Sequence, residues 1–387
     1  MDAVIEGRAA IIDAARALAP QFATRAGEGD TLRTMPPDLV AAAKAAGLFR
    51  LALPRMLGGL ELDPAAIAEV IETLSYADGS AGWTIMIGNS TLCFAWLDPQ
   101  VASSLIGDCP DVVSTSMFAP KGHAVADGCG GFVVDGRWPF NSGCPHADWY
   151  QVGVRVMDGE QPRVLPDGRP DLRFAFFPRT GGQVIETWDA LGLRGTGSHD
   201  LLVEGLRVPE EHTAAPLSEP ARHDGPLWRL PFRALLETFM GGFVLGVASR
   251  ALDEFAELAG TKTRGTAPGT LAHDPHVQVE LGRAEAGLLA GRALLTAVRD
   301  ELWATARTDS GQLSPELAAR HSLALLEAMR AGLAAVDITF ALTGADAVYD
   351  THPLQRCFRD LHTANQHMAF APEGFMRYAR LRLGIDG

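Results

Sequence analysis

One stretch in the middle of the chain divides it in two and reads Trp188-Asp189-Ala190-Leu191-Gly192-Leu193-Arg194-Gly195-Thr196-Gly197-Ser198, with Val208-Pro209-Glu210 following it. Three glycines within six residues favour a loop, because glycine adopts backbone conformations that end helices and strands. The stretch does not lie between a strand and a helix of a βαβ unit, so it does not predict a dinucleotide-binding fold. Short β-prone runs precede it, and long helical patterns follow it.

The stretch lies within a region that is typical of a small β domain, which we assign to residues 110–215 and whose β-prone runs lie before the stretch. β-branched and aromatic residues gather in short runs at Asp111–Ser114, Gly131–Val134, Trp149–Val154 and Phe174–Phe177. Turn signals separate the runs, with Asp135-Gly136 and Pro166-Asp167-Gly168 best suited to tight turns. Because no helical pattern lies between the runs, we expect an antiparallel barrel or sandwich.

Helical patterns occupy both ends of the chain, and we assign residues 1–109 and 226–387 to two helical domains. Near the N-terminus, apolar residues recur at helical spacing at Ile5, Ala9, Ile12, Ala15 and Leu18. Prolines at Pro36-Pro37 and Pro64 favour helix starts, since a missing N–H matters little in the first turn. Longer apolar stripes follow near the C-terminus at Val277, Leu281, Ala284, Leu288, Leu295, Val298 and Leu302, and at Leu323, Leu326, Met329, Leu333 and Val336. Such stripes need partners, so the last domain is predicted to be a four-helix bundle.

Composition excludes several classes of protein. Of the 387 residues, 47% are hydrophobic and 21% charged, the balance of an ordinary globular chain. The net charge of −14 argues against a general nucleic-acid or anionic-membrane surface. No uninterrupted apolar run reaches the roughly 20 residues that span a bilayer, and the N-terminus carries no signal-peptide core. Five cysteines without a C-x-x-C pair predict free thiols in a reducing cytoplasm.

Several catalytic motifs are missing from the sequence. It contains neither the phosphate-binding G-x-x-x-x-G-K-[ST] pattern nor the G-x-S-x-G pattern of serine hydrolases. His362 and His367 are five positions apart, whereas metal-binding pairs on a helix use a spacing of three or four. No metal site is therefore predicted.

Three segments together resemble a known family. They are the opening stretch, the segment Gly136–Gly143 with Ala147-Asp148-Trp149 after it, and the segment Phe358–His367. With the helix–β–helix order, they resemble the acyl-CoA dehydrogenase fold over essentially the whole chain. The resemblance implies an N-terminal helical domain, a central antiparallel β domain and a C-terminal four-helix bundle. It also implies that the family's long bundle helix begins near Arg250-Ala251-Leu252-Asp253.

This fold serves two chemistries. One branch holds FAD and oxidises acyl-CoA thioesters, for which a Glu removes a proton, and in many members that Glu follows shortly after an Arg-Asp pair. The corresponding positions after Arg359-Asp360 are His367 and Met368, so the common Glu is absent. Other members carry the base on the first bundle helix. Glu237 lies near that region, which leaves an FAD-dependent dehydrogenase with Glu237 as base as the alternative.

The other branch comprises flavin-dependent monooxygenases, which accept reduced flavin from a separate reductase and use O2. Members resemble this chain in placing a His shortly after an Arg-Asp or Arg-Asn pair, which selects His367 as a catalytic residue. The resemblance implies a reaction through a C4a-hydroperoxyflavin, which lasts only where water is excluded and its peroxide oxygen meets a hydrogen-bond donor. A His over the flavin can be that donor.

The resemblance also assigns contacts to the flavin ring. Phe140 would pack against the isoalloxazine, and the Ser142 hydroxyl would bond flavin N5 and act with His367 in catalysis. Asn141 would take the place of Ser142 if the register is shifted by one residue. Ser116 and Phe118 would line the pyrimidine side of the ring.

The sequence indicates the contacts to the flavin phosphate and to the substrate less clearly. In the family an Arg from the loop after the first bundle helix, often from a neighbouring subunit, holds the phosphate, which selects Arg264 and its neighbour Lys262. Trp83, Asn89 and Phe239 are the candidates for lining a substrate pocket. Phenol-oxidising members have a His in the region after a Gly-Trp pair, and this chain has none there, which argues against simple phenol activation.

The leading hypothesis is therefore the oxygenase component of a two-component flavin-dependent monooxygenase. It would take reduced FMN, with FADH2 as the other option, from a separate NAD(P)H-dependent reductase. With O2 it would oxygenate a small organic molecule, aromatic or polyketide-like. The resemblance implies a homotetramer, and we expect no nucleic-acid, membrane or metal partner. A homologue that binds no flavin in either redox state is a third hypothesis.

Overall fold

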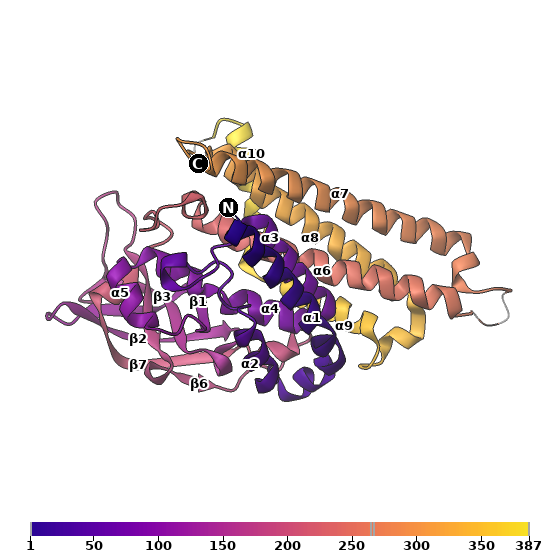
Figure 1. Cartoon of the computed structure of the whole chain (residues 1–387), viewed down its shortest axis with the longest axis horizontal. Coiled ribbons are helices and arrows are strands. Elements are labelled where there is room, and N and C mark those ends of the chain that lie inside the picture. Colours follow the sequence, from indigo (N-terminus) through magenta and orange to yellow (C-terminus); the bar gives the residue numbers. More distant parts are fainter. Residues whose placement is uncertain (1, 264, 266–267, 386–387) are drawn as a thin grey trace.

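The computed structural model describes residues 2–263, 265 and 268–385. Its elements follow the order helices, sheet, helices (Figure 1). The N-terminal helices lie beside the sheet and against the near side of the long bundle helices. The predicted fold class and its three-part order are confirmed. Arg264, the predicted phosphate ligand, lies outside the described residues.

The N-terminal part consists of α1 (Asp2–Leu32), α2 (Pro37–Ala45), α3 (Pro64–Ala77), α4 (Gly79–Gly88) and α5 (Pro99–Ile106), with 3-10 turns at Arg55–Leu57 and Ser90–Trp96. Three of these helices begin with proline, as the sequence predicts. The side chains of Asp63 and Asp98 accept hydrogen bonds from free backbone N–H groups in the first turns of α3 and α5. The helix starts are thus set locally by proline and an acidic cap.

The central part is one sheet of eight strands: β1 (Ser114–Ala126), β2 (Gly131–Asn141), β3 (Trp149–Asp158), β4 (Gln161–Pro162), β5 (Leu172–Pro178), β6 (Gln183–Ile185), β7 (His199–Pro209) and β8 (Thr213–Ala214). The strand order is β6-β7-β2-β1-β3-β5-β8, with β4 beside β3. β1 and β3 pair in parallel, while the other described pairs are antiparallel. The sheet is therefore mixed, which corrects the expectation of a purely antiparallel domain.

Two local predictions in this region are wrong. Asp135-Gly136 forms no turn but lies within β2, at a shift of register against β7. Gly136 is needed there because an added Cβ would come within 2.7 Å of the buried Trp138 ring. The predicted strand at Asp111–Ser114 starts only at Ser114, and β1 continues through residues that carry no clear β signal. The predicted turn at Pro166-Asp167-Gly168 is confirmed, with Gly168 at φ +86°.

The C-terminal part consists of three long helices, α6 (Phe232–Thr261), α7 (Pro275–Ala306) and α8 (Pro315–Thr343), followed by α9 (Pro353–Ala364) and α10 (Glu373–Arg382). The predicted apolar stripes of α7 and α8 face the bundle interior, with Val277, Leu288 and Val336 buried. Among the described residues, α6 is the one helix that is long and apolar enough to cross a membrane. The sequence alone does not single it out, because its apolar residues form no uninterrupted run. Since 83% of its most apolar window is buried inside the protein, as in a core helix, this is weak support for a span.

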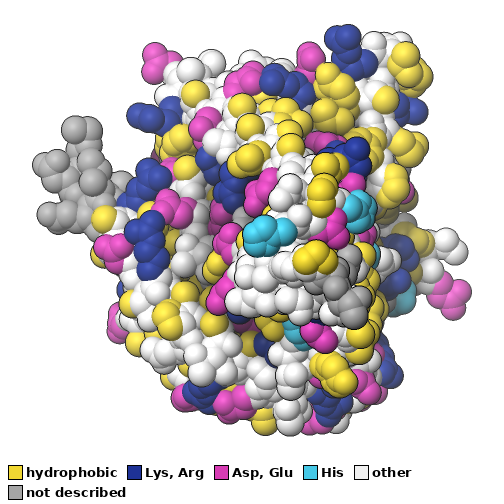
Figure 2. Space-filling view, turned by 90° about the vertical axis from the view of Figure 1, so that its right-hand side faces the viewer, with side chains coloured by type: hydrophobic (Ala, Val, Ile, Leu, Met, Phe, Trp, Pro, Cys, Tyr) yellow, Lys and Arg dark blue, Asp and Glu magenta, His cyan; other side chains and the backbone are white. Residues whose placement is uncertain are grey.

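Charged side chains of both signs lie on the molecular surface. On the face shown in Figure 2, the described acidic and basic side chains are interspersed among apolar ones rather than gathered into a basic area.

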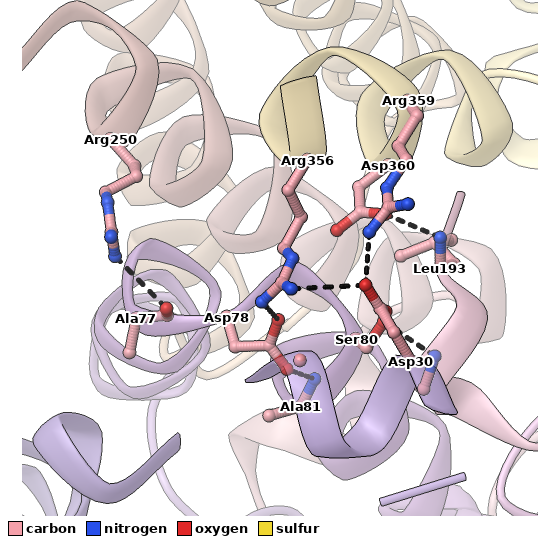
Figure 3. A network of polar contacts seen from close by, with 12 residues as sticks. Asp30, Ala77, Asp78, Ser80, Ala81, Leu193, Arg250, Arg356, Arg359 and Asp360 are labelled. Carbon is pink, nitrogen blue, oxygen red and sulfur yellow. Dashed lines mark hydrogen bonds and ion pairs between the residues drawn. The ribbon is translucent and has the colours of Figure 1, made fainter. Parts of the chain in front are cut away.

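A buried ionic network joins the three parts of the chain (Figure 3). Asp30 of α1 pairs with Arg356 and Arg359 of α9, and Asp78, before α4, faces Arg356. Asp360 accepts a hydrogen bond of 2.6 Å from the backbone N–H of Leu193, in the loop between β6 and β7. The opening stretch Trp188–Ser198 and the segment Phe358–His367 are therefore in direct contact.

Candidate active site

Ser142 lies at the centre of the candidate site, directly after the end of β2. Its side chain is buried, and its hydroxyl lies 3.0 Å from Nε1 of Trp83, on α4, and 2.7 Å from Oγ of Ser198, directly before β7. One acceptor position on Ser142 Oγ stays free after these contacts, because a hydroxyl oxygen offers two. The first and second sequence segments thus meet at this hydroxyl.

Phe140 points out of the sheet two residues earlier. Its backbone has φ +63°, a left-handed conformation that is rare for a bulky residue, and its side chain is 63% exposed. Trp188 contacts it edge-on, with ring centroids 6.4 Å apart. Phe140 lies at a shift of register between β2 and β7, and an exposed aromatic ring on strained backbone is a candidate ligand contact.

His367 lies on the far side of Trp83. The two ring centroids are 5.6 Å apart at an interplanar angle of 76°. Sequence counting placed His367 on a helix, but α9 ends at Ala364 and His367 caps the following 3-10 turn. Its Nδ1 accepts the backbone N–H of Ala369 at 3.1 Å, so the neutral ring carries its hydrogen on Nε2.

His367 is half-buried, and its surroundings favour the neutral ring. Desolvation lowers the pKa of His367 to about 4, and the positive charge of Arg233 on α6 adds to this effect. Nε2–H makes no hydrogen bond to any described residue. The ring is therefore an uncharged donor throughout the neutral pH range, and it needs no protonation to fill that role.

Other predicted flavin contacts lie deeper in the protein. Asn141 is fully buried, and neither polar atom of its amide has a partner among the described residues. Ser116 is also buried, where its hydroxyl lies 2.6 Å from that of Ser90. Phe118 stacks on Phe174 at 4.5 Å. Their roles toward a flavin stay predictions.

The three predicted substrate residues differ in their surroundings. Trp83 borders Ser142 and His367, as described above, and Phe239 is buried within α6. Asn89 is fully buried, and its amide is engaged with the backbone of Leu48, Leu51 and Ile85 at 2.8–2.9 Å. The structure thus gives Asn89 a packing role, and its assignment to the substrate pocket stays a prediction.

Glu237, the base of the alternative hypothesis, is held in a buried polar cluster. It accepts hydrogen bonds from Arg233 at 2.7 Å and Ser322 at 2.6 Å, and lies 3.1 Å from Nδ1 of His321. Burial alone would raise the pKa of Glu237, but the bond from His321 and the other partners lower it. A carboxylate with a lowered pKa and three partners is a poor proton acceptor.

Of the two cations proposed for the phosphate, only Lys262 lies in the described part of the chain. Its ammonium group is bonded to Asp346 and to the carbonyl of Thr343, each at 2.6 Å. These contacts hold the end of α6 against the turn after α8. Within this chain, Lys262 therefore has a structural role.

Sequence reasoning missed four residues that shape the site: Trp188, Thr196, Ser198 and Asp360. The first three stand in the opening stretch and the fourth in the third segment. A signal was present, since the hydroxyl residues Thr196 and Ser198 alternate with Gly195 and Gly197. The contact of Ser198 with Ser142, and of Thr196 with Ser198, joins segments distant in the sequence to the site and could not be read from spacing.

Family models match much of the chain. The model described as acyl-CoA dehydrogenase, N-terminal domain matches residues 6–98, and that described as acyl-CoA dehydrogenase, C-terminal domain matches residues 238–372. The indole-3-acetate monooxygenase of Pseudomonas putida is 34% identical over 347 residues, which cover 89% of this chain and 86% of that protein. This chain belongs to the flavin-dependent monooxygenases with the acyl-CoA dehydrogenase fold.

Two further relatives agree with this assignment. The flavin-dependent monooxygenase, oxygenase subunit HsaA, of Rhodococcus jostii is 31% identical, with 95% of this chain and 97% of that protein covered. The structure of XiaF from Streptomyces sp., in complex with FADH2 and glycerol, superposes with a TM-score of 0.89 at 26% identity. It covers 100% of this chain and 98% of XiaF. This monooxygenase therefore uses reduced flavin, and O2 is the co-substrate of its class.

The residues present fit a flavin. Phe140 offers an exposed aromatic face, Ser142 a free acceptor position and His367 a free N–H donor. Ser142 and His367 both contact Trp83. Phe140, two residues before Ser142, contacts Trp188, so the three residues belong to one region. A flat, partly polar ring system is the kind of ligand that such a set can hold.

Proposed function

We propose that this chain is the oxygenase component of a two-component system that hydroxylates a small aromatic molecule. A separate NAD(P)H-dependent reductase would supply the reduced flavin, with FMN as the preferred form and FADH2 as the alternative. The observation that carries the proposal is the succession of Ser142, Trp83 and His367. It unites a hydroxyl, an indole and a neutral imidazole donor from segments far apart in the sequence.

Each residue has a distinct task. When bound, reduced flavin supplies the two electrons with which one atom of O2 enters the substrate and the other leaves as water. Phe140 would pack against the flavin ring, and Ser142 would accept from or donate to its N5 position. His367 would donate Nε2–H to the oxygen that reacts, and Trp83 with the surrounding apolar side chains would keep water away.

An aromatic substrate suits the wall of the site. Trp83 meets Phe243 edge-on, with centroids 5.0 Å apart, and His367 continues the same wall. The relative from Pseudomonas putida is named for indole-3-acetate, a flat aromatic acid. Aromatic rings prefer such edge-to-face surroundings.

The proposal also covers the oligomeric state and the cellular compartment of the protein. Val279, Leu289 and Leu294 on α7 are 51%, 61% and 38% exposed. Apolar side chains along one long helix favour burial against other copies of the chain. We propose a homotetramer that works in the cytoplasm.

The test supplies the protein with FMN, NADH, a flavin reductase, indole-3-acetate and ¹⁸O2. The proposal predicts a product heavier by one ¹⁸O atom, formed only when the reductase is present. A matched reaction with His367→Ala should consume NADH but form little product. Oxidation of an acyl-CoA by a tightly bound FAD, without oxygen incorporation, would instead support the dehydrogenase alternative.

A further inference from the structure

A line of hydrogen bonds runs from Trp83 into the protein. Trp83 Nε1 lies 3.0 Å from Ser142 Oγ, Ser142 Oγ lies 2.7 Å from Ser198 Oγ, and Ser198 Oγ lies 2.5 Å from Thr196 Oγ1. Thr196 Oγ1 in turn lies 2.8 Å from the carbonyl oxygen of Leu193. All three hydroxyl groups are buried.

The two ends of this line fix its direction. The indole Nε1–H of Trp83 can only donate, and the Leu193 carbonyl can only accept. Each hydroxyl has one hydrogen, so four hydrogens serve four contacts and only one assignment fills them all. Trp83 donates to Ser142, Ser142 to Ser198, Ser198 to Thr196, and Thr196 to the Leu193 carbonyl.

The accepting end is held firmly. Leu193 has φ +52°, its N–H donates to Asp360, and its carbonyl also accepts Nε1–H of Trp188 at 2.9 Å. The peptide therefore cannot turn to present a donor to Thr196. Figure 3 shows the Asp360 contact that fixes it from the side of α9.

We propose that Ser198 and Thr196 are positioning residues that preset Ser142 as a hydrogen-bond acceptor toward the flavin. This inference rests on the proposed function, in which Ser142 faces flavin N5. Reduced flavin carries a hydrogen on N5 and oxidised flavin does not, so an accepting Ser142 discriminates between them. The two hydroxyls thereby favour binding of reduced over oxidised flavin.

Serving oxidised flavin would disturb the line. Ser142 would have to donate its hydrogen to N5 instead of to Ser198. Then either no hydrogen would lie between Ser142 Oγ and Ser198 Oγ, or Ser198 would donate to Ser142 and Thr196 to Ser198, which reverses the direction of the line. After reversal, Thr196 Oγ1 and the Leu193 carbonyl would face each other at 2.8 Å with no hydrogen between them. Losing one such buried hydrogen bond changes an affinity by about tenfold.

The test measures dissociation constants for oxidised FMN and, anaerobically, for reduced FMN. Ser198→Ala and Thr196→Val each remove one hydroxyl from the line. Either variant should lower the preference for reduced FMN about tenfold, because Ser142 can then donate. Thr196→Ser keeps the hydroxyl and should retain the wild-type preference.

A matched control is Thr339→Val, which removes a buried hydroxyl bonded only within α8. It should leave the preference unchanged. An unchanged preference in Ser198→Ala and Thr196→Val, with both redox forms still bound, would overturn the inference alone. A wild-type protein that binds neither form would contradict the proposed function as well.

Discussion

Asp360 provides the sharpest test of the interior network. It is buried beside Asp78 and Asp30, with Arg356 and Arg359 as the facing cations, so three carboxyl groups share two guanidinium groups. Burial raises the pKa of Asp360 to about 7, and the negative charge of Asp78 adds to the rise. In the unfolded chain the group titrates at its usual value of 3.8.

The sign follows from proton binding. Between pH 4 and pH 7, the folded protein retains a proton on Asp360 that the unfolded chain has already lost, so stability falls as the pH rises. Each pKa unit corresponds to about 1.4 kcal/mol, so the decrease amounts to at most about 4 kcal/mol and is complete above pH 7.

The perturbation is Asp360→Asn, which keeps the size and the oxygen that accepts from Leu193. The free energy of unfolding is measured by urea titration at several pH values from 5 to 8. The variant should gain stability relative to the wild type by about 3 kcal/mol as the pH rises from 5 to 8, because about two of the pKa units that separate the folded and unfolded carboxyl group lie in that range. A difference between the two proteins that does not change with pH would refute this reasoning.

Three further predictions concern Glu237, Phe140 and Gly192. Glu237→Ala should lower stability by about 1–3 kcal/mol in denaturant titrations, because buried Ser322 and His321 lose their partner. Glu237→Gln should still support oxygenation, and loss of turnover with this variant would favour Glu237 as a base. Phe140→Ala should change stability by less than about 0.5 kcal/mol because the ring is exposed, yet weaken reduced-FMN binding about tenfold; unchanged binding would remove Phe140 from the site. Gly192→Ala should lower the melting temperature, because the added Cβ would lie 2.1 Å from the carbonyl oxygen of Arg359, whereas the control Gly287→Ala places its Cβ in open space beside α7 and should not. Equal melting temperatures of the two variants would contradict the close contact between Gly192 and Arg359.

Patterns carried by single elements could be predicted from the sequence. Proline at the helix starts and the apolar stripe of α7 depend on neighbours within a few residues, so they appear as spacing. The placement of His367 followed from a resemblance in spacing to Arg359-Asp360. Its site in a turn, rather than on a helix, did not follow from that count.

Properties set by distant contacts could not be predicted. Asn89 looks like a polar pocket residue until its three backbone partners are known. Asp135-Gly136 resembles a turn, but pairing with β7 and the Trp138 ring hold it in a strand. The direction of the Ser142 hydroxyl depends on residues more than fifty positions away.

The central claim is that His367 and Ser142 control the reaction of bound reduced flavin with O2. The most direct measurement mixes the anaerobic complex of protein and reduced FMN with O2 and follows both O2 consumption and the return of oxidised flavin. The account predicts that oxidised flavin appears after a clear delay, and that His367→Ala abolishes the delay while leaving reduced FMN bound. Return of oxidised flavin at the rate of free flavin in the wild type, or an unchanged delay in His367→Ala, would contradict it.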